Sequence, residues 1–327
     1  MTLCVCLAGA VAAAGCGSDD SAGSKDSDAG PAKVRMATLG VASDAALRLG
    51  VEKGLFKKDD IDLKMTVVDA GGAAIAPALL KGEYDVAGGG IDGPLLAQAK
   101  GLDLKVLSDE GAPVSKGTTP KAGTKLGTTG LAVPKGSNVK SLADLRGQPI
   151  AGITVTGLQY LCVAGAMEKA GVDKEDVKVL EIPAPEMLPA LAAGRVKAAA
   201  LVEPFLTVAR QQGYRILDDP CVDSMPGAIQ AGYFTSSKWA KQNPELAARL
   251  GKALTRANRY AVAHPDEVRA AIPKYTKIKP QVAKEITLSP YDTSGKNTLG
   301  TVADQLVAYD LVDQKPDTEG ILTGAGR

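Results

Sequence analysis

Short apolar and β-branched runs alternate with longer stretches of helical periodicity through most of the chain. The runs predict strands at residues 34–39, 61–68, 85–88, 104–108, 149–154, 177–182, 197–202 and 214–217. Helices are expected to begin between these strands, near Asp44, Ala73, Pro94, Gly157, Ala184 and Pro204. Strands that alternate with helices are typical of a parallel sheet crossed by helices. The pattern therefore predicts an α/β fold.

The same order of segments occurs twice in the chain. Residues 52–63 match 168–179, residues 77–85 match 189–197, and residues 94–107 match 204–217. Because each copy carries its own strands and helices, we expect two similar lobes, each a mostly parallel sheet flanked by helices. The chain would cross between the lobes near 131–134 and return near 229–234, and these two strands would form a hinge.

After Phe234 the pattern is helical and carries no strand set of its own. Residues 244–263 place apolar residues at helical spacing after Asn243 as a cap, and Pro265 and Pro280 would open shorter helices. This tail is expected to pack on the first lobe. The expected division is therefore 33–131 with 234–327 for lobe 1 and 132–233 for lobe 2, with loops at 111–127 and 218–228.

The amino terminus sets the expected compartment. Residues 1–15 are uncharged and end in Ala14-Gly15 before Cys16, which resembles a bacterial lipobox. The resemblance implies a signal peptide over residues 1–16 and a lipid on Cys16 that anchors the mature protein to the membrane outside the cytoplasm. Residues 17–32 are polar and small, as expected of a flexible tether. No Lys or Arg precedes the apolar run, as expected if the start codon lies upstream of Met1.

Composition excludes several classes of function. The formal net charge is +1, from 38 basic and 37 acidic residues, so no nucleic-acid partner is expected. His264 is the single histidine and stands at a helix boundary, which argues against a multi-histidine metal site. Neither a metal nor a cofactor is expected. Once the amino-terminal cysteines are set aside, Cys162 and Cys221 remain, either as a disulfide or as two buried thiols.

Candidate binding residues follow from the expected topology. In open α/β sheets, ligands lie outside the carboxyl ends of the strands, where helix amino termini present unpaired N–H groups. Glycines at these positions let the backbone approach a ligand closely. The selected loops carry Ser43, Asp44, Gly71, Gly72, Gly90, Ile91, Asp92, Thr154, Thr156, Gln159, Tyr160 and Glu203. No residue is expected to be catalytic.

The side chains of these loops favour one kind of ligand. Asp44, Asp92 and Glu203 are acidic, and no Lys or Arg occupies the selected loops. Because a desolvated carboxylate is costly unless it is paired, a ligand with an amine or several N–H donors fits better than a bare anion. Helix capping outside the cleft is the alternative role for Asp44 and Asp92.

Short motifs point to one known family: Val51-Glu52-Lys53-Gly54-Leu55-Phe56, Gly71-Gly72, Asp85-Val86-Ala87, residues 94–101, residues 140–147 and Val202-Glu203-Pro204-Phe205. Together they resemble the substrate-binding proteins of ABC importers in the nitrate, sulfonate and taurine group, which also includes thiamine-precursor binders. The resemblance implies a type II periplasmic-binding-protein-like fold that closes on a small organic ligand, sulfonate- or taurine-like or amine-bearing. It also implies delivery to an ABC permease coupled to an ATPase, a monomeric protein and no enzymatic activity. Glu203 matches the family's acidic position before proline.

Two enzyme classes and a structural role are the alternatives. Residues 88–93 satisfy G-x-G-x-x-G between a strand and a helix, with Asp109 and Glu110 about 20 residues further on, as in an NAD-binding Rossmann-type oxidoreductase. A thiamine-pyrimidine synthase-like enzyme resembles the same fold family, but those enzymes look cysteine-clustered and histidine-dependent, unlike the mature body of this chain. A structural surface lipoprotein would not need glycine-lined loops that face each other across a hinge.

Overall fold

The computed structural model describes residues 30–68, 75–113, 127–289, 291 and 299–323. The chain divides into residues 1–30 and a compact unit, Pro31–Arg327, which carries the described helices and strands. Several predictions fall outside the described residues: the signal peptide, the lipid on Cys16, most of the tether, and the binding residues Gly71 and Gly72.

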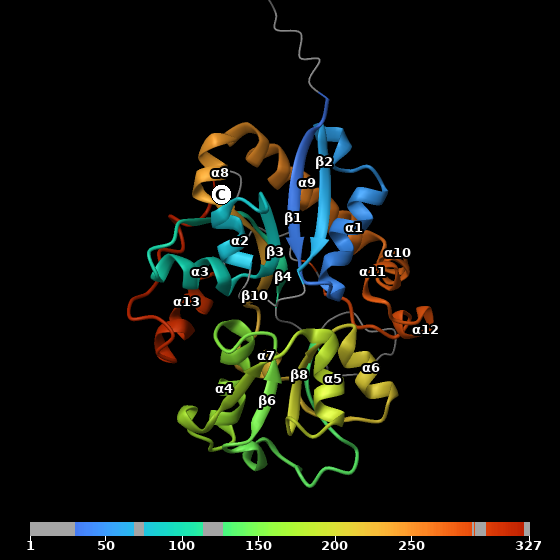
Figure 1. Cartoon of the computed structure of the whole chain (residues 1–327), viewed down its shortest axis with the longest axis vertical. Helices are drawn as coiled ribbons and strands as arrows, with labels where there is room; N and C mark the ends of the chain where they lie inside the picture. The colour runs from blue at the N-terminus through green and yellow to red at the C-terminus, as the bar shows by residue number, and fades with distance from the viewer. Residues whose placement is uncertain (1–29, 69–74, 114–126, 290, 292–298, 324–327) are drawn as a thin grey trace, which may run out of the picture. The chain divides into compact units, whose positions relative to one another are not determined.

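The first sheet contains five strands in the order β2-β1-β3-β10-β4 (Figure 1). They are β1 (Ala32–Thr38), β2 (Ile61–Val67), β3 (Val86–Gly90), β4 (Leu104–Pro113) and β10 (Ile229–Ser236). Strand β1 pairs in parallel with β2 and β3, whereas β10 runs antiparallel to β3 and β4.

The second sheet repeats this arrangement with the order β7-β6-β8-β5-β9. Its strands are β5 (Thr129–Val133), β6 (Pro149–Gly152), β7 (Lys178–Glu181), β8 (Ala198–Val202) and β9 (Arg215–Asp218). Strand β6 is parallel to β7 and β8, and β5 is antiparallel to β8 and β9. Strand β5 therefore occupies the position in this sheet that β10 occupies in the first. Along the chain, β5 is the next strand after β4 of the first sheet, and β10 is the next strand after β9 of the second sheet.

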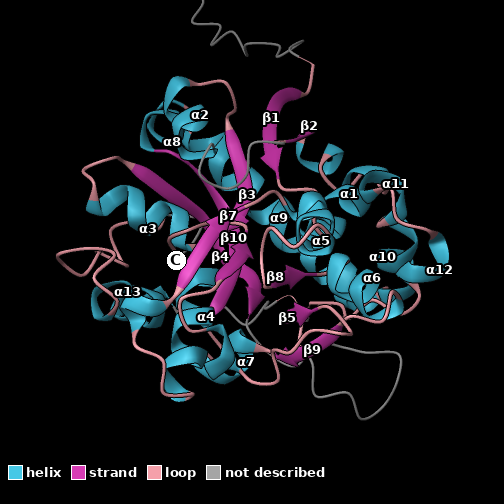
Figure 2. Cartoon of the chain, turned by 60° about the horizontal axis from the view of Figure 1, so that its bottom comes forward, coloured by secondary structure: helices cyan, strands magenta, loops and turns pink. Residues whose placement is uncertain are grey.

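Helices flank both sheets, as the view in Figure 2 shows, and the predicted α/β fold class is confirmed. The predicted helix starts lie within two residues of the observed first residues. The helices are α1 (Ala45–Glu52), α2 (Ile75–Lys81), α3 (Asp92–Ala99), α4 (Leu158–Lys169), α5 (Ala184–Ala192), α6 (Phe205–Gln211), α7 (Pro220–Ser224), α8 (Ser237–Gln242), α9 (Pro244–Ala263), α10 (Pro265–Ala271), α11 (Pro273–Thr276), α12 (Pro280–Ala283) and α13 (Leu299–Ala308).

Helix α9 covers one face of the first sheet and fixes the position of α1. Its buried residues, including Leu250, Leu254 and Ala257, recur at the spacing of one helical face, as the sequence predicted. Full burial of each leucine side chain contributes about 1.5–3 kcal/mol. Helix α1 packs closely on α9 at Gly50, where a Cβ atom would lie only 2.9 Å from the Cβ of Ala257. This close packing fixes α1, whose amino-terminal end carries Asp44.

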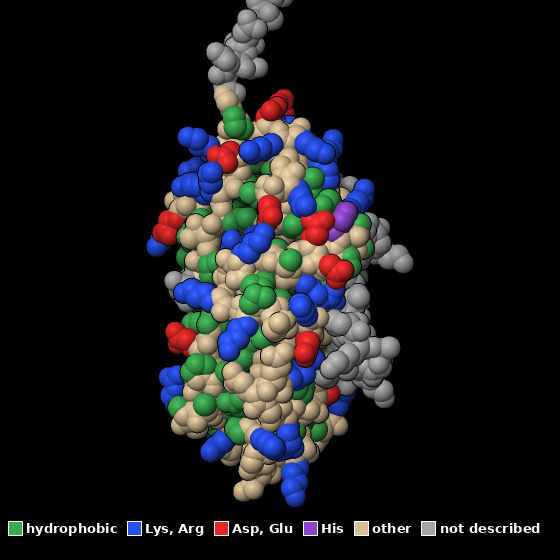
Figure 3. Space-filling model, turned by 90° about the vertical axis from the view of Figure 1, so that its right-hand side faces the viewer, with side chains coloured by type: hydrophobic (Ala, Val, Ile, Leu, Met, Phe, Trp, Pro, Cys, Tyr) green, Lys and Arg blue, Asp and Glu red, His purple; other side chains and the backbone are tan. Residues whose placement is uncertain are grey.

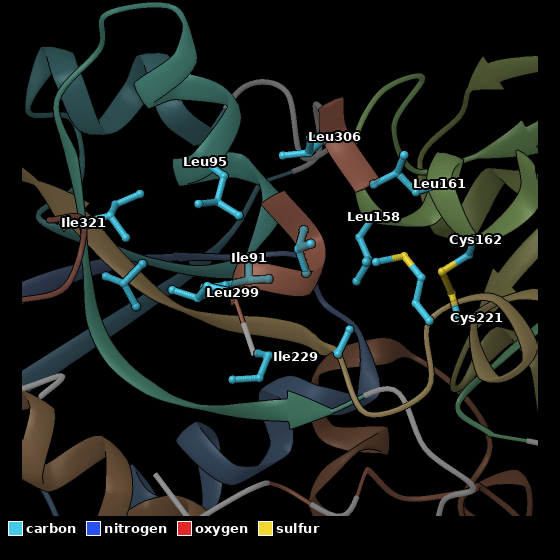
Figure 4. Close-up of a cluster of buried hydrophobic side chains, with 14 of the residues drawn as sticks. Ile91, Leu95, Leu158, Leu161, Cys162, Cys221, Ile229, Leu299, Leu306 and Ile321 are labelled. Carbon is cyan, nitrogen blue, oxygen red and sulfur yellow. A yellow bond between two sulfur atoms is a disulfide. The ribbon is translucent and has the colours of Figure 1, made fainter. Parts of the chain in front are cut away.

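A hydrophobic cluster joins helices that belong to different parts of the sequence (Figure 4). Ile91 and Leu95 at helix α3, Leu158 and Leu161 of α4, and leucines of α13 share this cluster. A disulfide between Cys162 and Cys221, whose Cα atoms are 4.5 Å apart, is part of it. The carboxy-terminal tail thus contacts α4, which flanks the second sheet, as well as α3 beside the first.

Charged side chains are spread over the surface. On the face drawn in Figure 3, Lys and Arg side chains are scattered rather than gathered into one patch, in keeping with the net charge of +1. His264 lies where α9 ends and α10 begins, and its ring stacks on that of Tyr260 with centroids 3.9 Å apart. Among the helices of the described residues, none is long and apolar enough to cross a membrane.

Candidate functional site

A cavity of about 140 Å³ lies at the edge where the parallel strands of both sheets end. Its walls come from residues that follow β1, β3, β6 and β8, from the first residues of β10, and from the tail. A cavity of ~150 Å³ accommodates a molecule the size of benzene. The lining residues are Leu39, Val41, Ala42, Ser43, Asp44, Ile75, Ala76, Gly89, Gly90, Asp92, Gly93, Thr128, Ile153, Thr154, Leu158, Gln159, Val202, Glu203, Gln230, Ala231, Phe234, Thr287 and Ser289.

The structure brings together most of the described residues that the sequence predicted for the site. Ser43, Asp44, Gly90, Asp92, Thr154, Gln159 and Glu203 all line the cavity. Three others do not. Ile91 is buried in the cluster of Figure 4, Tyr160 packs against that cluster from α4, and Thr156 is exposed. Ile91 and Tyr160 are neighbours in sequence of lining residues, but their side chains leave the backbone toward the core.

Asp44 is a buried carboxylate that both caps a turn and lines the cavity. Its Oδ2 accepts hydrogen bonds from the backbone N–H of Gly40 at 2.8 Å and of Val41 at 3.3 Å. Burial raises the pKa of Asp44 to about 6, although the nearby Arg48 guanidinium and these N–H groups act in the opposite direction. The two roles considered for this residue are therefore not exclusive.

Asp92 begins α3, and its carboxylate contacts the amino terminus of α4. The backbone N–H of Leu158, the first residue of α4, hydrogen-bonds this carboxylate. Gly157 precedes it with φ of +95°, and any Cβ atom there would collide with the carboxylate. Burial raises the pKa of Asp92 to about 6, and these backbone N–H groups oppose the rise. A carboxylate at a helix amino terminus also interacts favourably with the helix dipole.

Glu203 lines the cavity, but its carboxylate is occupied by protein donors. Oε1 accepts from Thr207 Oγ1 at 2.8 Å, from Arg210 at 3.0 Å and from the N–H of Thr287 at 3.2 Å. Oε2 accepts from the N–H of Thr207 at 3.1 Å, and the backbone oxygen of Glu203 accepts from Ala42 at 2.9 Å. Burial raises its pKa, and the Arg210 charge opposes the rise. The geometry favours Glu203 as a link between the β8–α6 turn and segments beside the first sheet.

The neutral side chains of the site differ in how many hydrogen bonds they already make. Gln159 accepts from Ile153 N–H at 2.5 Å and donates to Ala200 O at 2.9 Å, and the Thr154 hydroxyl donates to Thr156 O. Thr287 differs, because it is fully buried and its Oγ1 has no hydrogen-bond partner. A buried hydroxyl without a partner on a cavity wall is a group that a ligand can satisfy.

Several lining residues were not predicted from the sequence, above all Phe234, Thr287 and Ser289. Thr287 and Ser289 come from the tail, which follows the repeated segments and has no counterpart in the second half. No local pattern distinguishes them. Two tail tyrosines also hold the loop that carries Ser43, because Tyr275 and Tyr291 donate to the carbonyls of Val41 and Ser43, each at 3.0 Å.

The described lining residues include no Lys, Arg, His or Cys. Across the described ranges, no group of three or more His, Cys, Asp and Glu side chains is placed to hold a metal ion. The glycines of the NAD-like fingerprint lie elsewhere than that motif requires. Gly88, Gly89 and Gly90 are in strand β3 and pair with β10, whereas the Rossmann fingerprint forms the turn between strand and helix.

A family model and a curated relative match this chain. The family model described as NMT1/THI5 like matches residues 44–268, more than half of the chain. A curated protein of Escherichia coli (strain K12), described as an aliphatic sulfonates-binding protein, is 27% identical over 226 residues, or 64% of this chain. The match spans 66% of that relative, slightly less than two thirds of its length.

Solved structures with a similar backbone include a binding protein and an enzyme. The alkanesulfonate-binding protein SsuA from Xanthomonas axonopodis pv. citri, bound to MOPS, matches with a TM-score of 0.72 and 19% identity over 90% of this chain and 99% of that one. The desulfurization enzyme DszB matches with a TM-score of 0.61 and 16% identity over 89% of this chain and 96% of that one. These similarities show the periplasmic binding protein fold.

Proposed function

The chain belongs to the NMT1/THI5-like family, and on that premise we propose that it is the extracytoplasmic solute-binding component of an ABC import system. It captures a small organic ligand in the cavity and passes it to a membrane permease, whose ATPase drives uptake. The observation that carries this proposal is the cavity itself, which both sheets line at the edge where α/β folds bind ligands. The sulfonate-binding relatives support a small organic solute as the ligand class.

Capture works through closure of two lobes, 33–131 with 234–327 and 132–233, about the strands β5 and β10. Glu203 and Asp92 carry contacts between these lobes, because Glu203 accepts from Ala42 and Thr287 and Asp92 accepts from Leu158. Opening would break these contacts. A ligand that touches both walls adds contacts that exist only in the closed form, so it raises the closed population.

No bond is made or broken in this proposal, and the protein acts as a monomer. Because the desulfurization enzyme DszB has the same fold, catalysis is the second candidate function, and conversion of the bound molecule would reveal it. A lipid on Cys16 would hold the protein at the outer face of the membrane, close to the permease. The intact mass of protein recovered from the membrane fraction would test that anchor, since diacylation of Cys16 adds a defined mass that a Cys16→Ala variant lacks.

The binding function is tested on the protein as purified. Native mass spectrometry before any dialysis should recover a retained small molecule, and calorimetry with that molecule should give one site per chain. Small-angle scattering should then show a more compact particle with ligand than without. No retained molecule, no heat across a broad panel of small solutes and unchanged scattering would refute the function. Chemical conversion of the bound molecule during incubation would favour an enzyme instead.

A further inference from the structure

We propose, on the basis of the function above, that the ligand is a small molecule with an apolar body and one positively charged nitrogen group, which lies against Asp44 and Asp92. An amine, amidine or guanidine on a compact hydrocarbon body has this chemistry. The proposal names the charge class of the ligand, which the sulfonate-binding relatives would not suggest.

The charges around the cavity carry the first step. Among the described residues, three carboxylates line the cavity, and of these only Glu203 forms an ion pair with another described residue, Arg210, at 3.0 Å. Among the described lining residues there is no cationic side chain to neutralise Asp44 or Asp92. The Arg48 guanidinium of α1 lowers the pKa of Asp44, but it is not among the described lining residues and lies 4.3 Å from the centre of the Tyr275 ring. A positively charged ligand would supply the missing charge, and buried carboxylates are costly without it.

The backbone N–H groups beside Asp44 and Asp92 favour a cation over an anion. An anionic ligand would bind to exposed N–H groups at turns and helix amino termini. Here the N–H groups of Gly40 and Val41 already bond to Asp44, and that of Leu158 bonds to Asp92. A sulfonate at the amino terminus of α4 would have to displace the Asp92 carboxylate and remain beside its charge. A cation leaves these hydrogen bonds intact.

Thr287 provides an independent third observation. Its hydroxyl is fully buried on the cavity wall without a partner, so its oxygen can accept a hydrogen bond from a ligand N–H. The remaining walls are largely apolar, with Leu39, Ile75 and Phe234 among them. Together with a volume of about 140 Å³, this combination fits a hydrocarbon body of about the size of benzene with one polar end.

The proposal fixes the sign of the pH dependence. The groups that influence Asp44 are Thr38, Arg48 and the N–H groups of Gly40 and Val41, and its charge in turn affects Tyr275 and Tyr291. Asp92 is influenced by backbone N–H groups, its own and that of Leu158. Because burial raises both pKa values to about 6, both carboxylates gain protons between pH 8 and pH 5. A cation therefore binds more weakly at pH 5 than at pH 8, whereas an anion binds more tightly.

The test uses three ligands of one shape, cyclopentylamine, cyclopentanol and cyclopentanesulfonate, measured by calorimetry at pH 8 and pH 5. The amine stays protonated and the sulfonate ionised at both pH values, so any pH dependence belongs to the protein. We expect the amine to bind at least tenfold more tightly than the alcohol at pH 8, and this preference to shrink at pH 5.

Variants assign the effect to residues. Asp44→Asn and Asp92→Asn keep an acceptor oxygen for the backbone N–H groups, and each should weaken amine binding at least tenfold at pH 8. Thr287→Val should weaken it by a smaller factor, and the exposed Asp313→Asn should leave it unchanged. Circular dichroism and thermal midpoints of the free variants show whether each is folded, and Asp92→Asn alone decides if Asp44→Asn is not.

The outcomes separate the cation assignment from the function itself. Tighter binding of the sulfonate, equal binding of all three ligands, or an amine affinity that both Asn variants retain would overturn the cation assignment and leave solute binding in place. If none of the three binds, the charge of the molecule recovered by native mass spectrometry decides. If no molecule is recovered either, both proposals fail.

Discussion

Replacement of Gly157 by alanine should destabilise the protein more than an equivalent change elsewhere, because Gly157 touches Asp92. Gly157 has a φ of +95°, and a new Cβ atom would collide with the Asp92 carboxylate. Backbone strain at such a position costs about 1–3 kcal/mol for a residue other than glycine. Displacement of the carboxylate would also break its hydrogen bond with the Leu158 N–H, and the loss of this buried bond costs about 1–3 kcal/mol more. The expected loss in free energy of unfolding is therefore ~2–6 kcal/mol.

Gly171→Ala is the matched control. Gly171 lies just after the same helix, has a φ of +80°, and has no atom within 4 Å of the position of a new Cβ. This variant should show only the backbone cost of about 1–3 kcal/mol, without the cost of the lost contact. Urea denaturation followed by circular dichroism measures both losses, and calorimetry with the bound solute measures affinity. Where the contact forms only in the closed state, Gly157→Ala should also weaken binding by tenfold or more.

A double variant tests whether the contact itself is responsible. Replacing Asp92 by alanine removes the atoms that the new Cβ of Gly157→Ala would strike, so the double variant should recover part of the loss. The two changes should then be non-additive by at least 1 kcal/mol, which is expected only for residues in contact. Equal losses for Gly157→Ala and Gly171→Ala, with additive effects of Asp92→Ala, would refute the contact between Asp92 and α4.

Three further perturbations follow from the same structure. Glu203→Gln should lower the free energy of unfolding by about 1.5–3 kcal/mol, because Arg210 loses its partner and hydrogen bonds to a charged group become neutral ones; an unchanged urea midpoint would contradict this. The pKa values of Asp44 and Asp92 are about 6 in the folded protein, against 3.8 for an ordinary aspartate. Between these two values the folded protein holds protons that the unfolded chain has lost, so the contribution of both groups to stability should fall as pH rises from about 4 to about 6. Asp92→Asn should flatten that fall in denaturation curves at closely spaced pH values, and an unaltered slope would exclude a buried, protonatable Asp92. The pair Cys162→Ser and Cys221→Ser opens a link between residues 59 apart, which in the chain-entropy model removes roughly 4 kcal/mol; a thermal midpoint equal to that of the parent protein would show that the link contributes nothing.

The positions of most strands and helices could be predicted from the sequence because each is encoded in a local pattern. Buried β-branched runs recur with helical stretches between them. Because the same sequence of elements appears twice, the repeat predicts the same fold for both halves. The two sheets have the same strand order, β2-β1-β3-β10-β4 and β7-β6-β8-β5-β9, in keeping with the repeat, but the order itself was not predicted. Helix α9, residues 244–263, was predicted to the residue, because proline opens it and an amphipathic pattern runs its whole length.

The site was less predictable because its chemistry depends on partners distant in the chain. Glu203 is predicted as a ligand contact, and it lines the cavity, but its carboxylate already accepts hydrogen bonds from protein donors. These donors are Thr207 and Arg210, four and seven residues on, and Thr287, 84 residues on. Thr287 itself stands in a tail without repeat or motif. Ile91 and Tyr160 stand in loops that the expected topology selects, but the direction of a side chain depends on the exact phase of the backbone, which a loop boundary does not reveal.

The interchange of β5 and β10 between the two sheets has a consequence for how the newly made chain matures. Strand β4 acquires its partner only when residues 229–236 have been synthesised, so the first half of the polypeptide cannot finish its own sheet by itself. Until then the edges of β3 and β4 wait for a segment more than 100 residues downstream, and such distant pairings form slowly. The first sheet is therefore completed only after the whole of the second sheet has been synthesised, because β5 to β9 all precede β10 in the chain.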